Sequence, residues 1–413
     1  MIHFHKYTLP NGLRILVHVD ESTPIVAINT LYDVGARDET PDKTGFAHLF
    51  EHLMFGGSIH IPQFDTPLQE AGGNNNAFTS NDITNYYVTL PVENVETALW
   101  LESDRMLNLA FSPESLEVQR KVVIEEFKQR YLNQPYGDVW LELRPMAYKT
   151  HPYRWATIGQ SIAHIEDATL EDVKAFFAAH YNPANAILSI AGNVDPERIF
   201  QQVEHWYADI PAKVKPLRNL PTEQPNKGYE LKTLLRNVPQ NALYMAWSMP
   251  ERMHPDYPAC DLLSDILGQG KSSRLYEALV KNQALFTSIS CYVTGSIDPG
   301  LLVISGMLDP QTDFETARAA VMEILANVRQ TAASPKELQK VKNQFESNYV
   351  FSQLGVLNKA MNAAFFELLG DAELANTLTA HYAAVEAEDI HRLAGQIFQD
   401  ENLSELRIQS THV

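Results

Sequence analysis

The apolar positions of this chain recur in blocks that predict alternating helices and strands. Residues 44–55 are rich in Ala, Leu, Phe and Met and end at Gly56-Gly57, which indicates a buried helix closed by a glycine turn. Residues 113–131 follow Ser112, a typical capping residue, and predict an amphipathic helix. The apolar stripe of this second helix comprises Val122, Val123, Phe127 and Tyr131.

Three landmarks occur in the same order in both halves of the chain. The first is an apolar helix before a glycine-rich turn, the second is a Ser-Pro helix start, and the third begins a helix that leads to a closing strand. The paired segments are 47–54 with 260–267, 112–116 with 334–338, and 170–173 with 387–390. Helix caps recur by chance in many proteins, but their shared order favours duplication of one fold.

A proline-rich segment divides the chain near its midpoint. Residues 211–225 contain four prolines, weak apolar periodicity and mixed charge, which is typical of an extended connection. We therefore expect an α+β fold of two homologous domains, each an antiparallel-rich sheet packed with helices. The expected boundaries are 1–210 for the first domain, 211–228 for the linker and 229–413 for the second domain.

The composition argues against several classes of protein and of metal site. The chain is 45% hydrophobic and carries a net charge of −19, which repels nucleic-acid phosphates and otherwise favours solubility. No apolar run approaches the roughly 20 residues of a membrane-spanning helix, and the start does not resemble a signal peptide, so we expect a cytoplasmic protein. The cysteines are Cys260 and Cys291 alone, so a metal ion must be held by His and carboxylate side chains.

The predicted helix at 44–55 carries the pattern His48-Leu49-Phe50-Glu51-His52. Residues four apart share a helix face, so His48 and His52 can bind one ion, at about 2.0–2.1 Å for zinc. Glu51 lies beside them and can act as the general base for an attacking water. Two solvated histidines are the alternative, but this helix is otherwise apolar, and buried polar groups require a partner.

A catalytic zinc site needs a third protein ligand and an open position. The helix at 113–131 offers two neighbouring carboxylates, Glu125 and Glu126, and its pattern does not decide between them.

A second glycine-rich segment, residues 268–273, superficially resembles a phosphate-binding loop. It lacks the preceding glycine that the P-loop spacing requires, which argues against a nucleotide-binding enzyme.

The pattern H-x-x-E-H with a distant glutamate resembles the signature of the pitrilysin/insulinase family of zinc peptidases, the inverzincins. The similarity extends over nearly the whole chain and favours the short, two-domain type. The resemblance implies one zinc ion per chain, bound by His48, His52 and Glu126, with Glu51 as the catalytic base. It also implies an edge strand that binds a peptide through main-chain hydrogen bonds. The residues implied for this strand are Asn76, Ala77 and Phe78.

The duplicated halves fit the family, whose members pair a catalytic and a degenerate copy of one domain. The second half has Asp261, Ser264 and Asp265 where the first has its metal motif, so it is expected to be a degenerate copy without a metal site. The chain departs from the family pattern in two places. Many family members have a supporting glutamate seven residues before the metal glutamate, and this chain has Gln119 at that place. The Arg/Tyr pair that usually helps to hold substrate is replaced by two other residues. These are Val280 and Thr287.

These observations predict a zinc metalloendopeptidase that hydrolyses extended or unfolded peptides. Nucleic acid and membrane partners are not expected. The missing Arg/Tyr pair predicts a dimer, in which a homologous chain supplies the two residues. A non-catalytic scaffold subunit is the alternative, and the presence of Glu51 argues against it.

Overall fold

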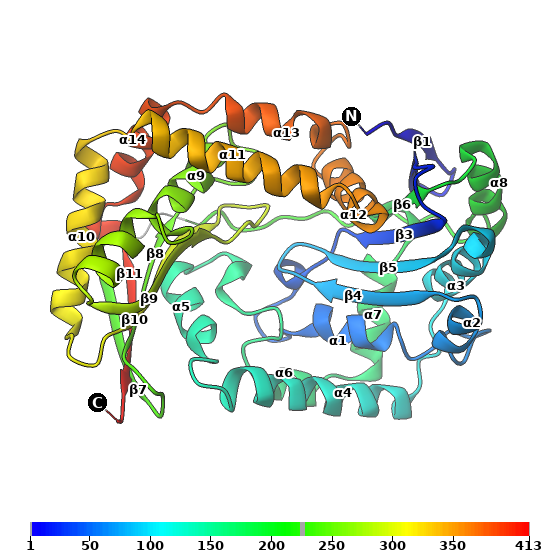
Figure 1. Ribbon diagram of the computed structural model, residues 1–413. Coiled ribbons are helices and arrows are strands. Elements are labelled where there is room, and N and C mark those ends of the chain that lie inside the picture. Colours follow the sequence, from blue (N-terminus) through cyan, green and yellow to red (C-terminus); the bar gives the residue numbers. More distant parts are fainter. Residues whose placement is uncertain (1, 224–227, 413) are drawn as a thin grey trace. The chain divides into compact units, whose positions relative to one another are not determined.

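Two mixed β-sheets of matching topology organise the computed structural model, which describes residues 2–223 and 228–412 (Figure 1). The first sheet has the strand order β1-β2-β6-β3-β5-β4 and the second has the order β7-β11-β8-β10-β9. The strands are β1 (His5–Thr8), β2 (Arg14–Val19), β3 (Ile25–Tyr32), β4 (Asn74–Thr79), β5 (Thr84–Pro91), β6 (Ala186–Gly192), β7 (Glu230–Arg236), β8 (Ala242–Ser248), β9 (Phe286–Val293), β10 (Leu301–Leu308) and β11 (Ser404–Ser410).

The two sheets repeat one pairing scheme. In the first, β2 pairs with β6 in parallel, and the remaining pairs are antiparallel. In the second, β7 pairs with β11 in parallel, and the remaining pairs are again antiparallel. Apart from the additional β1, each strand of one sheet has a counterpart at the same place in the other. The predicted α+β fold of two homologous, antiparallel-rich sheets is confirmed.

Helices cover both sheets. In the first half they are α1 (Phe46–Leu53), α2 (Asp65–Glu70), α3 (Val95–Leu107), α4 (Pro113–Phe127), α5 (Val139–Ala147), α6 (Ile162–Glu166), α7 (Leu170–His180) and α8 (Pro196–Tyr207). In the second half they are α9 (Tyr257–Gly268), α10 (Phe314–Gln330), α11 (Pro335–Ser352), α12 (Val356–Leu368), α13 (Leu374–Ala383) and α14 (Ala387–Ile397). Among the described residues, no helix combines the length and apolarity that crossing a bilayer requires.

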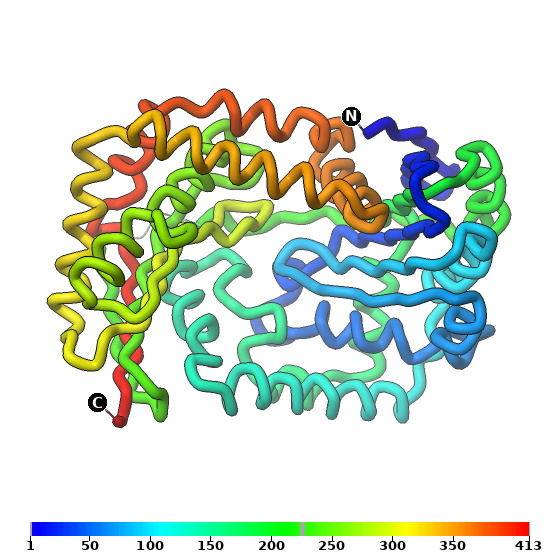
Figure 2. The backbone as a smooth tube through the Cα atoms, in the orientation of Figure 1, coloured from blue at the N-terminus to red at the C-terminus, as the bar shows by residue number. Residues whose placement is uncertain are grey.

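Each half of the sequence contributes one helix to the sheet of the other half. Helix α12 packs its small residues against β3 and β6, and α5 packs against β8 and β11, as the colours in Figure 2 show. The chain therefore divides into two compact units, each built from three segments. Unit 1 comprises Met1–Phe127, Trp155–Leu220 and Val350–Leu378, and unit 2 comprises Lys128–Arg154, Pro221–Tyr349 and Thr379–Val413.

These units differ from the contiguous domains that the sequence predicted. The periodicity of α5 and α12 shows that each is amphipathic, but it carries no information about which sheet the apolar face covers. The expected linker at 211–228 belongs to unit 1 as far as Leu220, and its residues 224–227 lie outside the described part of the chain.

Helix α4 is shorter than predicted, and its buried stripe matches the predicted one only in part. It ends at Phe127 and continues as a π-helical turn, Lys128–Leu132. Leu116, Val123 and Phe127 are buried and lie seven and four residues apart, so they share one face. The predicted stripe member Val122 is 45% exposed, because it lies about 100° around the helix from Val123.

Candidate metal centre

Helix α1 has one apolar face and one face that carries the candidate metal ligands and the candidate base. Leu49, Phe50 and Leu53 are buried in the core of unit 1. His48, Glu51 and His52 lie on the other side of the helix and remain partly accessible. The chain can enter this helix sharply because Gly45 has a φ of 87°, which favours glycine. A Cβ atom there would lie 2.5 Å from the Ile158 carbonyl oxygen.

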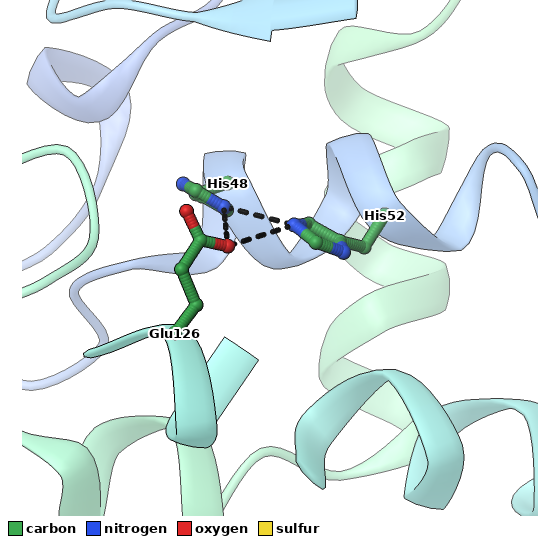
Figure 3. A group of neighbouring side chains, drawn as sticks. All are labelled: His48, His52 and Glu126. Carbon is green, nitrogen blue, oxygen red and sulfur yellow. Dashed lines mark hydrogen bonds and ion pairs between the residues drawn. The ribbon is translucent and has the colours of Figure 1, made fainter. Parts of the chain in front are cut away.

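Three ligand atoms converge beside α1 (Figure 3). The Nε2 atoms of His48 and His52 lie 3.0 Å apart, and the Glu126 Oε2 atom lies 3.2 Å and 3.3 Å from them. Two ligands at about 2.0–2.1 Å from one tetrahedral ion are separated by about 3.3 Å. The donor set, two imidazoles and one carboxylate, is one that zinc accepts while keeping a fourth position open. The three residues therefore fit a catalytic zinc ion.

Helix α4 decides which of its two neighbouring carboxylates reaches the site. Val123 and Phe127 are buried, and α4 packs against α1. Glu126 is half-buried and points at both imidazoles, whereas Glu125 is exposed. The geometry thus groups Glu126 with the histidines, a choice that the helical pattern alone left open.

Glu51 lies next to the ligands without belonging to the three-residue cluster. Its Oε2 atom accepts a hydrogen bond of 2.5 Å from the Thr79 hydroxyl group on β4. Burial raises the pKa of Glu51, while the Thr79 hydroxyl group and nearby His52 lower it and Glu126 raises it. A carboxylate with a raised pKa is a stronger proton acceptor than a solvated one, which suits a general base.

The strand of the predicted peptide-binding residues forms the outer edge of the first sheet. Ala77 lies opposite Tyr86 and Phe78 lies opposite Asn85 in the pairing of β4 with β5. Side chains alternate along a strand, so Ala77 shares the face of Thr79 toward α1, while Asn76 and Phe78 lie on the opposite face. The Ala77 N–H group donates to Asn76 Oδ1 over 2.8 Å. The substrate-binding role of these residues stays a prediction.

Gln119 lies two helical turns before Glu126 on α4 and is half-buried. Within the described residues, it makes no hydrogen bond to His48, His52 or Glu126. Seven residues along a helix correspond to a rise of about 10.5 Å, which is longer than a single hydrogen bond between the two side chains can span. A supporting role for Gln119 at the metal stays a prediction.

Glu39, which caps the metal-bearing helix, was not predicted from the sequence. Its Oε2 atom accepts from the Gly45 N–H group at 2.9 Å, and its Oε1 atom accepts from the Ala47 N–H group at 2.8 Å. Burial raises the pKa of Glu39, while these two N–H groups lower it. A capping carboxylate usually occupies the N-cap or the first turn, and Glu39 lies six residues before Gly45. No spacing rule would have singled it out.

Unit 2 has a different arrangement at the counterpart of the metal motif. On α9, the Asp261 Oδ2 atom accepts a hydrogen bond of 2.6 Å from the Tyr382 hydroxyl group. The ring of Phe345 on α11 stacks on Tyr382 with a centroid separation of 3.4 Å. Ser264 donates to the Asp261 carbonyl oxygen. Aromatic side chains thus cover the carboxylate that stands in the place of His48.

We expect Asp265 on α9 to make the stability of the protein depend on pH. Burial and the nearby Asp261 raise the pKa of Asp265 from 3.8 to about 7, while Lys340 opposes this. Because the folded-state pKa lies above the unfolded-state value, the folded state binds this proton more tightly. The corresponding stability is fully present below pH 3.8 and is lost as the pH rises through about 7.

We therefore expect the substitution Asp265→Asn to raise the free energy of unfolding at pH 8 and to have little effect at pH 4. One pKa unit corresponds to about 1.4 kcal/mol, and partial solvent exposure reduces the total to on the order of 2 kcal/mol. Urea unfolding at both pH values measures the effect. Asp256→Asn is the matched control, because Arg392 lowers the pKa of Asp256, so its loss should not stabilise the protein. Equal unfolding midpoints for wild type and Asp265→Asn at pH 8 would contradict the prediction.

Comparisons with known proteins point to one family of peptidases. Residues 14–159 match the family model described as insulinase (peptidase family M16), and residues 167–345 match the model described as the peptidase M16 inactive domain. The zinc protease PqqE of Helicobacter pylori is 27% identical over 401 residues, which cover 95% of this chain and 90% of that protein. The probable mitochondrial-processing peptidase subunit beta of Arabidopsis thaliana is 23% identical over 411 residues, covering 96% and 76% of the two chains.

A solved structure shares the whole architecture. The crystal structure of a protease from Helicobacter pylori superimposes with a TM-score of 0.94 at 26% identity, covering 99% of this chain and 100% of that chain. The metal motif and Glu126 lie in the segment that matches the insulinase model, and α9 lies in the segment that matches the inactive-domain model.

Proposed function

Because this chain belongs to the insulinase family of peptidases (family M16), we propose that it is a zinc-dependent endopeptidase that cleaves extended peptides. The observation that carries the proposal is the convergence of His48, His52 and Glu126 within hydrogen-bonding distance of one another. An additional carboxylate, Glu51, lies three residues after His48 and directly before His52, and it is not needed as a ligand. This combination supports hydrolysis more strongly than a structural metal site, which would use all four ligand positions.

Different residues of the chain have different roles in the proposed reaction. The two imidazoles and Glu126 would hold the zinc ion. When bound, zinc supplies Lewis-acid chemistry, which polarises the peptide carbonyl group and makes water more acidic. Glu51 accepts the proton of the attacking water and passes it to the nitrogen of the leaving amine. The Thr79 hydroxyl group orients the Glu51 carboxylate through its hydrogen bond.

The edge strand β4 supports a substrate that is extended and not folded. A peptide that adds to a sheet edge is bound by main-chain hydrogen bonds, so its side chains matter less for binding. β4 pairs with β5 on one side, and its other edge is the outer edge of the first sheet. Such a peptide would compete with Asn76 Oδ1 for the Ala77 N–H group.

We also propose that a homologous chain completes the active site. The two positions that carry an arginine and a tyrosine in many family members are Val280 and Thr287 here. Neither side chain can donate the charge-assisted hydrogen bonds of an arginine to a bound peptide. A dimer in which another chain supplies these groups would restore the missing contacts.

Cleavage of a quenched fluorogenic peptide tests the proposal. We expect the zinc-loaded protein to cleave an unstructured peptide, a metal chelator to stop the reaction, and added zinc to restore it. A chain that binds zinc and cleaves at full rate as a monomer would remove the need for a partner. A chain that binds zinc but cleaves no peptide, alone or with a homologous chain, would overturn the peptidase function in favour of a scaffold role.

A further inference from the structure

One short turn, Gly35 to Glu39, contacts three parts of unit 1 that bear on the metal centre. It contains the 3₁₀ helix η1 (Ala36–Asp38). We propose that Glu39 is a positioning residue of the metal centre, which sets the start and the rotation of α1 and thereby the position of its two imidazoles relative to Glu126. The inference rests on the proposed function, because it concerns the same site.

The first contact is the cap on α1. Gly45, the N-cap residue, has no side chain that could accept a hydrogen bond from the first turn of the helix. The two oxygen atoms of Glu39 bind the N–H groups of Gly45 and Ala47, so the carboxylate spans the start of the helix. His48 follows Ala47 directly, and His52 follows one turn later. A change in where α1 begins would move both imidazoles relative to Glu126, which lies on another helix.

The second contact is with the turn between β4 and β5. The Ala36 N–H group donates to the Ser80 carbonyl oxygen at 3.1 Å, and the Arg37 N–H group donates to the Asn81 carbonyl oxygen at 2.9 Å. The Arg37 guanidinium group also lies 3.1 Å from Asp82. This turn directly follows Thr79, the hydrogen-bond partner of Glu51. The segment that caps the metal helix is therefore also fixed to the strand that orients the base.

The third contact is with the segment that follows α8. The Arg218 guanidinium group binds both oxygen atoms of Asp38, at 2.7 Å and 3.0 Å, and Asp33 Oδ1 at 2.9 Å. Lys215 lies 2.7 Å from the other oxygen atom of Asp33. The side chains of Asp33 and Asp38 are only 5% and 8% exposed, whereas Arg218 is 24% exposed, so the carboxylates of these ion pairs are largely removed from solvent. Arg218 thus holds the residue that immediately precedes Glu39.

The three contacts leave Glu39 little freedom. The carboxylate is 7% exposed, its neighbour in the chain is bound by an arginine, and its turn is hydrogen-bonded to the β4–β5 turn. A rigid cap of this kind determines helix geometry more tightly than a solvated one, because neither partner can relax into water. Positioning of ligands by buried hydrogen-bonded neighbours commonly changes metal affinity by about 10–100-fold.

Metal affinity and ligand geometry test the role of Glu39 without relying on peptidase activity. We compare wild type with Glu39→Gln, which keeps the shape and one acceptor, and with Glu39→Ala. Arg218→Gln tests the support from the third contact. The zinc dissociation constant is measured by competition with a chelator, and the site geometry is measured by the visible absorption spectrum of the cobalt(II)-loaded protein. Asp195→Ala is the matched control, because Asp195 caps α8 and accepts from Glu197 and Arg198, away from the metal.

We expect the zinc dissociation constant to rise about 10-fold in Glu39→Gln and more in Glu39→Ala, with an altered cobalt(II) spectrum. Arg218→Gln should give a smaller change in the same direction, and Asp195→Ala should lower the melting temperature without changing zinc affinity. Unchanged affinity and spectrum in Glu39→Gln, with a loss of thermal stability like that of Asp195→Ala, would overturn the proposal. A wild-type protein that binds zinc normally but cleaves no peptide, alone or with a homologous chain, would overturn the proposed peptidase function and leave this inference standing.

Discussion

We expect Glu51→Gln to abolish most peptide cleavage while the protein keeps its zinc. The amide has the size of the carboxylate but cannot accept a proton, so kcat should fall by about 10³-fold, within the range for loss of a general acid–base group. Glu51 is not one of the three clustered ligand candidates, so the zinc content should stay near one per chain. Fluorogenic peptide cleavage and metal analysis of the same preparation measure both quantities.

Thr79→Val provides a graded comparison for this substitution. It removes the hydroxyl group that donates to Glu51 but leaves the carboxylate itself, so we expect a loss of activity of about 10-fold or less. Zinc content should be unchanged in both variants. If Glu51→Gln retained more than a tenth of wild-type kcat at equal zinc content, another group would have to be the base.

Glu126→Gln should lose zinc, and Glu125→Gln should not. Glu126 Oε2 lies 3.2 Å and 3.3 Å from the two imidazole nitrogen atoms, and a neutral amide at this place is a much weaker ligand than a carboxylate. Changes outside the direct ligands commonly cost about 10–100-fold in metal affinity, so loss of a ligand should exceed about 100-fold. The zinc dissociation constant, measured by chelator competition, and the residual activity in excess zinc report the effect.

Glu125→Gln is the control that the chain itself offers. The two residues are neighbours on α4 and the substitutions are chemically identical, but Glu125 is exposed and Glu126 points at the histidines. Any general effect of removing a negative charge from this helix should therefore appear in both variants. Equal loss of zinc in both, or a greater loss in Glu125→Gln, would show that α4 presents its other carboxylate to the metal.

The metal motif shows which parts of the site can be predicted from local spacing and which cannot. His48, Glu51 and His52 lie within a single turn of one helix, so their common face follows from helical geometry alone. Glu126 is separated from His48 by 78 residues, and two adjacent carboxylates fit the helical pattern equally well. The choice between them followed from family resemblance, and in the structure it depends on which face of α4 packs against α1.

The positions that support the site were beyond sequence analysis. Glu39 lies in an irregular turn, and its contact with α1 depends on the path of the intervening loop. Thr79 was not singled out, because a threonine on a strand has many ordinary roles. Val122 was expected in the core, since periodicity identifies an amphipathic helix more reliably than the exact face that it buries.

By itself, the sequence determined the α+β class, the duplication, the helix that carries the histidines and the chemistry of the donor set. These depend on periodicity, helix caps and residue type, which act within a few residues along the chain. Only the tertiary structure decided that α5 and α12 each cover the sheet of the other half, that Glu39 caps α1, and that Thr79 holds Glu51. Those contacts join residues far apart in the chain or across irregular loops. Their formation depends on how complementary surfaces pack once the chain is folded, and no local pattern encodes that choice.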